Sequence, residues 1–206
     1  MSTRDHWNDV YTHKAPCTVS WHRTHLEQSL AWVEDLGLPR TAHIVDIGGG
    51  ASTFVDDLLD QRFESVSVAD ISAQALEHSK RRLGPRTGQV RWVVGDVTEP
   101  LFPDDSVDLW HDRAVFHFLT SPSQQGAYRA QVLRCVRPGG VVIIATFAPD
   151  GPERCSGLQV ARYAPQEIAA AMGPGFELLQ EAAEEHSTPK GSPQAFAYAL
   201  LRRLPT

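Results

Sequence analysis

Between residues 42 and 147, short runs of apolar, β-branched residues alternate with longer amphipathic stretches. In the amphipathic stretches apolar residues return every three or four positions, as Val132, Leu133 and Val136 do, which predicts helices. The short runs are apolar throughout, which is typical of strands buried on both faces of a parallel sheet. The predicted strands are 42–47, 65–70, 90–95, 107–112 and 140–147, and the predicted helices between them are 52–61, 73–83 and 123–136.

Strands and helices that alternate in this way predict an α/β fold with a doubly wound, Rossmann-like sheet. The pattern changes after residue 150, where a loop (148–160) and a short helix (165–172) precede two strand-like runs, 176–187 and 194–204. A turn joins these two runs, which predicts a C-terminal antiparallel hairpin on a mostly parallel, seven-stranded sheet. A further helix is predicted over residues 24–37.

Composition narrows the range of functions. The 206-residue chain carries a formal charge of −6, which gives no electrostatic footprint for nucleic acid or for an anionic membrane. It contains no apolar run of about 18 residues that would predict a membrane span, and its first residues lack the apolar core of a signal peptide. Cys17, Cys135 and Cys155 form no CxxC pair. We therefore expect a cytoplasmic, reduced protein without nucleic-acid or membrane partners.

The most informative stretch is 46-DIGGGAST-53, which follows the first predicted strand. A strand that ends in a glycine-rich turn and opens a helix presents backbone N–H groups to a ligand. The nicotinamide fingerprint G-x-G-x-x-G is incomplete, because Gly48 and Gly50 match it and Thr53 does not. Asp46 would repel a pyrophosphate and attract a cationic, amine-bearing ligand. A tight turn that binds no ligand is the alternative.

With these residues the sequence resembles the class I S-adenosylmethionine-dependent methyltransferases. Asp46, Gly48 and Gly50 match the acid and the alternating glycines of their first motif. Ser52 departs from that motif, because the family often has a third glycine there. Later motifs of the family are matched, in chain order, by 66-VSVADIS-72, 93-VVGDV-97, 107-VDLWHDRAVFHF-118 and 133-LRCVRPGGVVIIATF-147.

The resemblance implies that residues 41–206 form a methyltransferase domain that binds S-adenosyl-L-methionine. In the family, the acid that ends the second strand binds the ribose hydroxyls, which assigns this role to Asp70, with Ile71 beside it. The acid after the third strand meets the adenine amino group, which assigns that role to Asp96, with Val97 beside it. The motif residues around the first glycine turn complete the predicted cofactor site.

Residues 1–40 are predicted to form an N-terminal helical lid segment. The runs 6-HWNDVY-11 and 19-VSWH-22 resemble the aromatic lids of thiopurine, tellurite and some protein-lysine methyltransferases. Tyr11 and Trp21 are then expected to contact the cofactor. The alternative is that these aromatic residues pack a helix onto the sheet.

Methyl transfer from a sulfonium depends mainly on alignment and exclusion of water. Asp112 is predicted to lie beside the methyl group, with Arg113 as its partner, and His117 is a candidate general base. A histidine on a helix face without a catalytic role is the alternative for His117. Cys155 and His186 are predicted to border the acceptor, against the alternatives of an inert, buried cysteine and ordinary turn chemistry.

The candidate histidines and cysteine lack the close pairing of a metal site, apart from His22 and His25, so no metal is predicted. We expect a methyltransferase, monomeric or homodimeric, that acts on a small-molecule acceptor such as a thiol or another chalcogen compound. A protein-lysine methyltransferase and a catalytically inactive cofactor-binding module are the alternatives.

Overall fold

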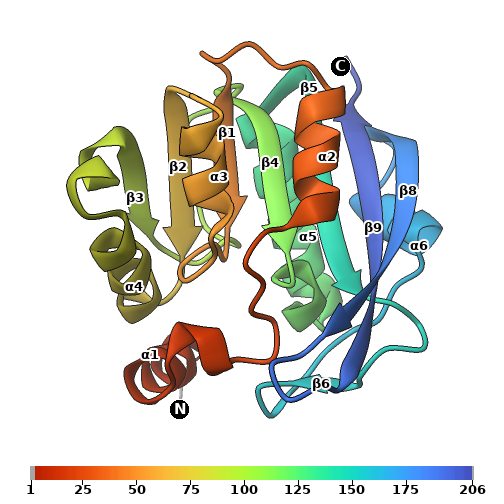
Figure 1. The fold of residues 1–206 in the computed structure, drawn as a ribbon. Helices are drawn as coiled ribbons and strands as arrows, with labels where there is room; N and C mark the ends of the chain where they lie inside the picture. Colours follow the sequence, from red (N-terminus) through yellow and green to blue (C-terminus); the bar gives the residue numbers. More distant parts are fainter. Residues whose placement is uncertain (1–2, 206) are drawn as a thin grey trace.

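The computed structural model describes residues 3–205, which form one seven-stranded sheet with helices on both faces (Figure 1). The strand order is β3-β2-β1-β4-β5-β9-β8, in which β1 to β5 are parallel, β9 is antiparallel to β5, and β8 is antiparallel to β9. This confirms the predicted mostly parallel sheet with a C-terminal antiparallel hairpin. The strands are β1 (His43–Ile47), β2 (Ser65–Asp70), β3 (Val90–Val94), β4 (Val107–Arg113), β5 (Val136–Phe147), β8 (Phe176–Ser187) and β9 (Pro193–Arg203).

Helices α2, α3 and α4 pack on one face of the sheet, and α5 and α6 pack on the other. Helix α1 lies apart from both layers, below the carboxyl ends of the parallel strands (Figure 1). None of the helices within residues 3–205 has the length and apolar character needed to cross a membrane. The helices are α1 (Thr3–His13), α2 (Glu27–Asp35), α3 (Phe54–Asp60), α4 (Ala73–Leu83), α5 (Pro122–Cys135) and α6 (Pro165–Met172).

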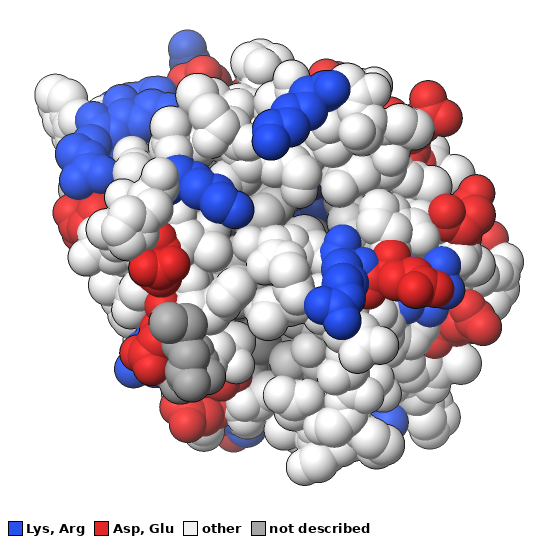
Figure 2. Space-filling model, turned by 90° about the horizontal axis from the view of Figure 1, so that it is seen from below, with Lys and Arg blue, Asp and Glu red and all other residues white. Residues whose placement is uncertain are grey.

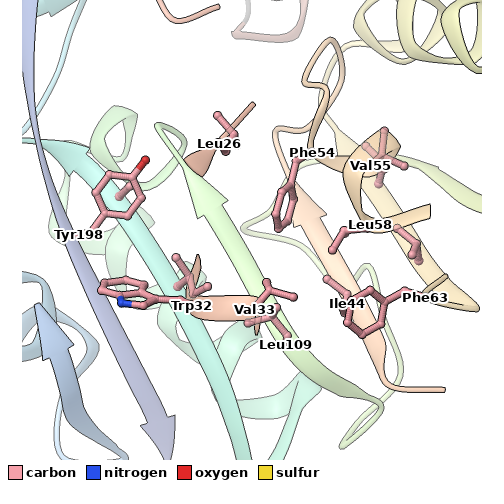
Figure 3. Packing of buried hydrophobic residues seen from close by; sticks show 14 of the residues in the cluster. Leu26, Trp32, Val33, Ile44, Phe54, Val55, Leu58, Phe63, Leu109 and Tyr198 are labelled. Carbon is pink, nitrogen blue, oxygen red and sulfur yellow. The ribbon is translucent and has the colours of Figure 1, made fainter. Parts of the chain in front are cut away.

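The strands supply both layers of the core because successive side chains of a strand point to opposite faces. Ile44 and Leu109 belong to the cluster on the α2, α3 and α4 side, whereas Trp110 belongs to the cluster on the α5 and α6 side. Trp32 and Val33 of α2 pack into the first cluster (Figure 3). Truncating a buried aromatic residue of this kind costs about 3–5 kcal/mol, so α2 is firmly part of the sheet layer.

Some bounds differ from those predicted. Strand β5 begins at Val136 rather than at residue 140, because Val136 already pairs with Val107 of β4. Helix α5 begins at Pro122, because Ser121 and Gln124 form a capping box there. The sequence pattern also did not delimit α1 or the short hairpin of β6 (Arg154–Cys155) and β7 (Leu158–Gln159).

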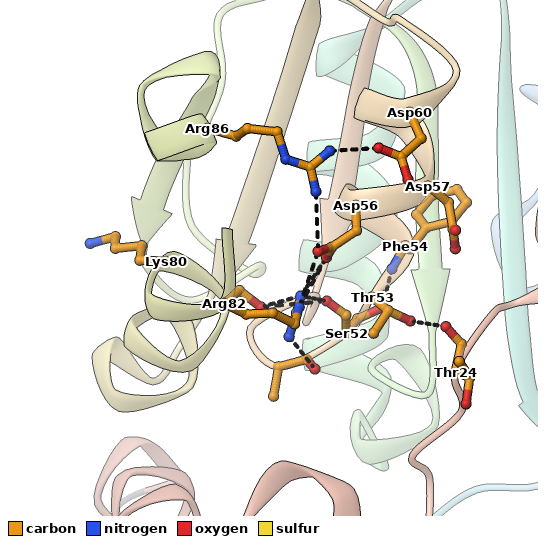
Figure 4. A network of polar contacts seen from close by, with 12 residues as sticks. Thr24, Ser52, Thr53, Phe54, Asp56, Asp57, Asp60, Lys80, Arg82 and Arg86 are labelled. Carbon is orange, nitrogen blue, oxygen red and sulfur yellow. Dashed lines mark hydrogen bonds and ion pairs between the residues drawn. The ribbon is translucent and has the colours of Figure 1, made fainter. Parts of the chain in front are cut away.

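A polar network holds the glycine-rich turn between β1 and α3 (Figure 4). Arg82 of α4 donates to the carbonyl oxygens of Ala51 and Ser52 and forms an ion pair with Asp56 of α3 at 2.7 Å. The Thr53 hydroxyl donates to the carbonyl oxygen of Thr24 at 2.8 Å. The turn is therefore fixed from α3, from α4 and from the segment that precedes α2.

Arg82→Ala should lower the free energy of unfolding by about 1–2 kcal/mol, because it removes several partly exposed links worth about 0.5–1 kcal/mol each. Urea unfolding followed by circular dichroism measures this loss. Arg81→Ala is the matched control, since Arg81 is exposed on the same helix and its guanidinium donates to His78 rather than to the turn. A loss of equal size in both variants would contradict the role given to Arg82.

Candidate active site

A cavity of about 360 Å³ lies at the carboxyl edge of the sheet, between the strand ends and α1. This volume is within the range of small-molecule sites, about 300–1,000 Å³. Figure 2 looks onto this edge and shows a hollow near the middle of the face, surrounded mostly by uncharged side chains. The predicted site residues that line the cavity are Tyr11, Trp21, Gly48, Asp70, Ile71, Asp96, Val97 and Cys155.

Asp70 ends β2 and is held in a fixed orientation. Its Oδ1 accepts a hydrogen bond from the Ser72 amide at 2.8 Å, and its Oδ2 accepts one from the Gly50 amide at 3.1 Å. Burial raises the pKa of Asp70 to about 6; these hydrogen bonds oppose the rise and the charge of Asp46 adds to it. A carboxylate has about four acceptor sites, so Asp70 can still accept hydrogen bonds from a ligand in the cavity.

Asp96 follows β3 and lines the same cavity, with Val97 beside it. Its Oδ1 accepts hydrogen bonds from the amide of Thr98 at 2.9 Å and from the Thr98 hydroxyl at 2.7 Å. These bonds orient the carboxyl group, so the carboxyl groups of both Asp70 and Asp96 are held in fixed orientations before a ligand binds. Their contacts with the ribose and the adenine stay predictions.

The three glycines of the turn have different roles. Gly48 lines the cavity with a φ of +66°, and a Cβ there would lie 2.1 Å from Cγ2 of Val115. A Cβ on Gly49 would lie 2.1 Å from Oδ2 of Asp46, and one on Gly50 would lie 2.5 Å from Oδ2 of Asp70. Gly50, a predicted cofactor residue, is therefore not part of the cavity wall; it leaves room for the Asp70 carboxylate and donates its amide to it.

Aromatic rings from the N-terminal segment cover the cavity. Trp7 packs edge-on against Trp21 and Phe118, with ring centroids 5.7 Å and 5.1 Å apart, and Tyr11 packs against Trp21 at 6.3 Å. Trp7 and Phe118 also line the cavity, and the prediction did not include them among the site residues. The only sequence signal for Trp7 was its place in the aromatic run before residue 12.

Helix α1 is docked on α4 by two hydrogen bonds. The hydroxyl of Ser72 donates to Oδ1 of Asn8, and Nε2 of His78 donates to the carbonyl oxygen of Tyr11, both at 2.8 Å. Both contacts are only partly buried, and Val10 and Tyr11 are the buried residues of α1, so a small number of contacts holds this helix.

The segment between α1 and α2 is bound more tightly. The guanidinium of Arg113 donates to the carbonyl oxygen of Trp21 at 3.3 Å and forms an ion pair with Glu184 of β8 at 3.0 Å. Glu184 also pairs with Arg23 at 2.9 Å, and His186 donates from Nε2 to the carbonyl oxygen of Ser20 at 2.7 Å. Glu184 is thus shared by two arginines, which ties this segment to the C-terminal hairpin.

The structure corrects the expected position of Asp112. The side chain is fully buried and faces α5, where Oδ2 accepts a hydrogen bond from the Tyr128 hydroxyl at 2.7 Å and Oδ1 accepts one from the Val115 amide at 2.9 Å. It does not line the cavity, and Arg113, its expected partner, pairs with Glu184 instead. The reason is the alternation of β4, which turns neighbouring residues to opposite faces. We do not propose a catalytic role for Asp112.

His117 is likewise not at the cavity wall. The ring is fully buried against Phe118 and Phe147, and Nδ1 accepts a hydrogen bond from the Phe147 amide at 3.4 Å. Burial, with a smaller contribution from the charge of Arg113, lowers the pKa of His117 to about 3, so the ring is neutral at physiological pH. A ring that does not reach the cavity cannot take a proton from an acceptor there, and we do not propose His117 as the general base.

The two predicted acceptor residues are separated. Cys155 of β6 lines the cavity, and burial raises the pKa of its thiol to about 12, so it is not a thiolate. His186 is buried in β8, where its hydrogen bond to Ser20 gives it a structural role outside the cavity wall. Leu158 and Gln159 of β7 line the cavity beside Cys155 and were not predicted.

Part of the chain is similar to a known family of proteins. Residues 44–140 match the methyltransferase-domain family. Together with the topology of the sheet, this match supports a class I S-adenosylmethionine-dependent methyltransferase with S-adenosyl-L-methionine as its cofactor.

A curated relative is the eEF1A lysine and N-terminal methyltransferase of Mus musculus, which is 23% identical over 154 residues. The matched part covers 72% of this chain and 22% of that protein, so the chain spans about a fifth of the length of this relative.

Two solved structures share the fold over almost the whole chain. One, from work on the conversion of a disulfide bond into a thioacetal group during echinomycin biosynthesis, has a TM-score of 0.80 at 15% identity and covers 98% of this chain and 93% of its own. The other is the Burkholderia thailandensis 1,6-didemethyltoxoflavin-N1-methyltransferase with bound 1,6-didemethyltoxoflavin and S-adenosylhomocysteine. It has a TM-score of 0.69 at 22% identity and covers 98% and 84% of the two chains.

Asp70→Ala should weaken binding of S-adenosylhomocysteine at least tenfold, because hydrogen bonds to a charged acceptor contribute about 1.5–3 kcal/mol each. In the unaltered protein, affinity should fall as the pH drops below 6, where Asp70 takes up a proton and loses acceptor capacity. Calorimetry above and below pH 6 measures both effects. Asp35→Ala, at an exposed position of α2, is the control. An unchanged affinity of Asp70→Ala would exclude the ribose assignment.

Proposed function

We propose that this protein transfers the methyl group of S-adenosyl-L-methionine to a small nucleophilic acceptor that reacts without a protein base, such as a thiol or another chalcogen compound. The chemistry of the cavity wall carries this proposal. The ionisable side chains that line the cavity, within residues 3–205, are Tyr11, Asp70, Asp96, Arg113 and Cys155.

None of these five groups suits a general base beside the acceptor. Burial raises the pKa of Tyr11 above its usual range and that of Cys155 to about 12, so both are protonated at neutral pH. Arg113 is a cation paired with Glu184. Asp70 ends β2 and Asp96 follows β3, and β1 separates both strands from β4. Both acids belong to the proposed adenosine end of the cavity. An alcohol or an ammonium would need a base to remove its proton, whereas a thiolate does not.

The residues present fit the cofactor. Asp70 offers a buried carboxylate for the ribose, Gly48 leaves the backbone bare, and Oδ2 of Asp46 is a buried carboxylate oxygen without a hydrogen-bond partner among the described residues. When bound, S-adenosyl-L-methionine supplies an electrophilic methyl group on a sulfonium. The rings of Trp7 and Trp21 would exclude water from the reacting atoms.

The proposed reaction is an in-line displacement. The acceptor nucleophile forms a bond to the methyl carbon while the bond between that carbon and the sulfonium sulfur breaks, which leaves S-adenosylhomocysteine and the methylated acceptor. The chain's own contribution is alignment and a closed, dry cavity. With α1 docked, a cavity of about 360 Å³ for cofactor and acceptor together favours a small acceptor.

A protein-lysine methyltransferase is the second candidate. The similarity to the Mus musculus enzyme over 72% of the chain favours it. The cavity disfavours it, because a lysine ammonium must lose a proton before it can accept a methyl group and the wall offers no suitable base.

A panel of acceptors tests the proposal. We expect methylation of an aromatic thiol and of an aliphatic thiol, with kcat/KM rising with pH along the ionisation of each thiol, because the acceptor and not the protein loses the proton. His117→Asn should leave the shape of these profiles unchanged. Faster methylation of a lysine peptide or an alkylamine, or one pKa common to all acceptors, would contradict the proposal. Binding of S-adenosylmethionine without turnover of any acceptor would indicate an inactive module.

We further propose that α1 is the lid of this site. Amides of α1 should exchange faster in the free protein and gain protection when S-adenosylhomocysteine binds, because few contacts dock this helix. Amides of residues 19–24 should stay protected in both states, since Arg113, Glu184 and His186 hold that segment. Hydrogen exchange with mass spectrometry measures both segments at once. Equal protection of α1 with and without ligand would make it permanent packing.

A further inference from the structure

Three buried polar side chains form a continuous chain behind the glycine turn. Nδ1 of His111 is 2.7 Å from Oδ1 of Asp46, and Nε2 of His111 is 2.9 Å from the hydroxyl of Ser29. The exposed fractions of Asp46, His111 and Ser29 are 2%, 0% and 0%. The three residues come from β1, β4 and α2, and the parallel register of β1 and β4 places Asp46 directly beside His111.

One arrangement of protons satisfies all three groups. Nδ1 of His111 donates to the Asp46 carboxylate, and Nε2 accepts the hydroxyl proton of Ser29. The ring of Phe54 packs on the imidazole, with centroids 4.2 Å apart and an angle of 33° between the planes. Both nitrogens and one face of His111 are therefore fixed, which removes most of the rotational freedom of the ring.

This fixed imidazole sets the orientation of the Asp46 carboxyl group. With Oδ1 bound to His111, Oδ2 is directed towards Gly49. Of the three glycines of the turn, Gly49 is the one at which an added Cβ would clash with this oxygen. Oδ2 is buried and has no partner within residues 3–205. A buried carboxylate oxygen without a donor is costly unless a cationic or hydrogen-bonding group meets it.

A side cavity of about 40 Å³ lies in front of Asp46 and adjoins the proposed methyltransfer site. Tyr11, Trp21, Gly48 and Arg113 line both cavities. The side cavity is large enough for a small polar group and too small for a ring system. Arg23 and Arg113 also line it, but Glu184 pairs with both, which leaves the Asp46 carboxylate as the charge of this wall that suits a cation.

Ser29, His111 and Asp46 have the composition of a hydrolytic triad, but the hydroxyl of Ser29 cannot meet a substrate. It lies beneath α2 with no exposed surface. The series of hydrogen bonds begins at Ser29, which is covered, and ends at the Asp46 carboxylate, which borders the side cavity. Ser29 and His111 therefore act on the Asp46 carboxylate and not on a substrate.

We propose that His111 and Ser29 are positioning residues that hold the Asp46 carboxylate with Oδ2 aimed at the ammonium group of the methionine part of the cofactor. This inference rests on the proposed function, because it concerns the same ligand. In metal sites, residues that orient a ligating side chain contribute a factor of about 10–100 to affinity, and we expect an effect at the lower end of this range here.

Two probes separate this role from a merely structural one. S-adenosylhomocysteine carries the ammonium group, whereas 5′-methylthioadenosine has the same adenosine and sulfur without the amino-acid part. Ser29→Ala and His111→Leu should weaken binding of S-adenosylhomocysteine about tenfold, which is about 1.4 kcal/mol, and leave binding of 5′-methylthioadenosine unchanged. His111→Asn should recover part of the loss, because its side-chain amide can donate to Asp46 in place of Nδ1.

Calorimetry on the full chain measures these affinities. Equal weakening of both probes would assign the chain to packing of the core, and unchanged binding of both would show that Asp46 needs no support; either result overturns the inference. If the unaltered protein bound neither probe, the proposed cofactor site itself would fail. Ser29→Ala removes a single oxygen atom and is the variant expected to fold even if His111→Leu does not.

Discussion

Asp46 of β1 lies between Val68 of β2 and His111 of β4, and this parallel register controls where every charged group of the site stands. Because the strands run in the same direction, β1, β2 and β4 all end at one edge of the sheet. The glycine turn, the Asp70 carboxylate and the segment after β4 therefore meet around one cavity. An antiparallel neighbour at β1 would move one of these groups to the opposite edge.

The site concentrates negative charge that the fold must tolerate in the free protein. The pKa of Asp70 is raised from 3.8 to about 6, chiefly by burial and further by Asp46. A raised pKa means that the folded protein disfavours the ionised carboxylate, so ionised Asp70 costs roughly 3 kcal/mol of stability above pH 6, and this cost declines as the pH falls to 3.8. A cationic ligand with hydroxyl groups would compensate for this cost when it binds. The same groups that lower stability without a ligand therefore favour the cofactor.

Other charges near the site are balanced within the protein. Glu184 neutralises Arg113 and Arg23 together, and its pKa is lowered, because the attraction of the two guanidinium groups outweighs the opposing effect of burial. This network fixes the segment before α2 and leaves α1 held mainly by its aromatic rings and two hydrogen bonds. Rigid and loosely held parts of the N-terminal segment thus lie next to each other, an arrangement suited to a gate over a preorganised site.

The sequence by itself determined the strands of the sheet, the C-terminal hairpin, the glycine turn and the acids Asp46, Asp70 and Asp96 at strand ends. These features depend on local periods and on glycine chemistry, which neighbouring residues specify. Only the tertiary structure decided which face of the sheet each residue of β4 points to. A strand that is buried on both faces shows no alternation of apolar and polar residues, so the sequence could not assign Asp112 and Arg113 to a face. The burial of His117 and the contact of Ser29 with His111 also escaped prediction, because they join residues far apart in the chain through packing that no local pattern records.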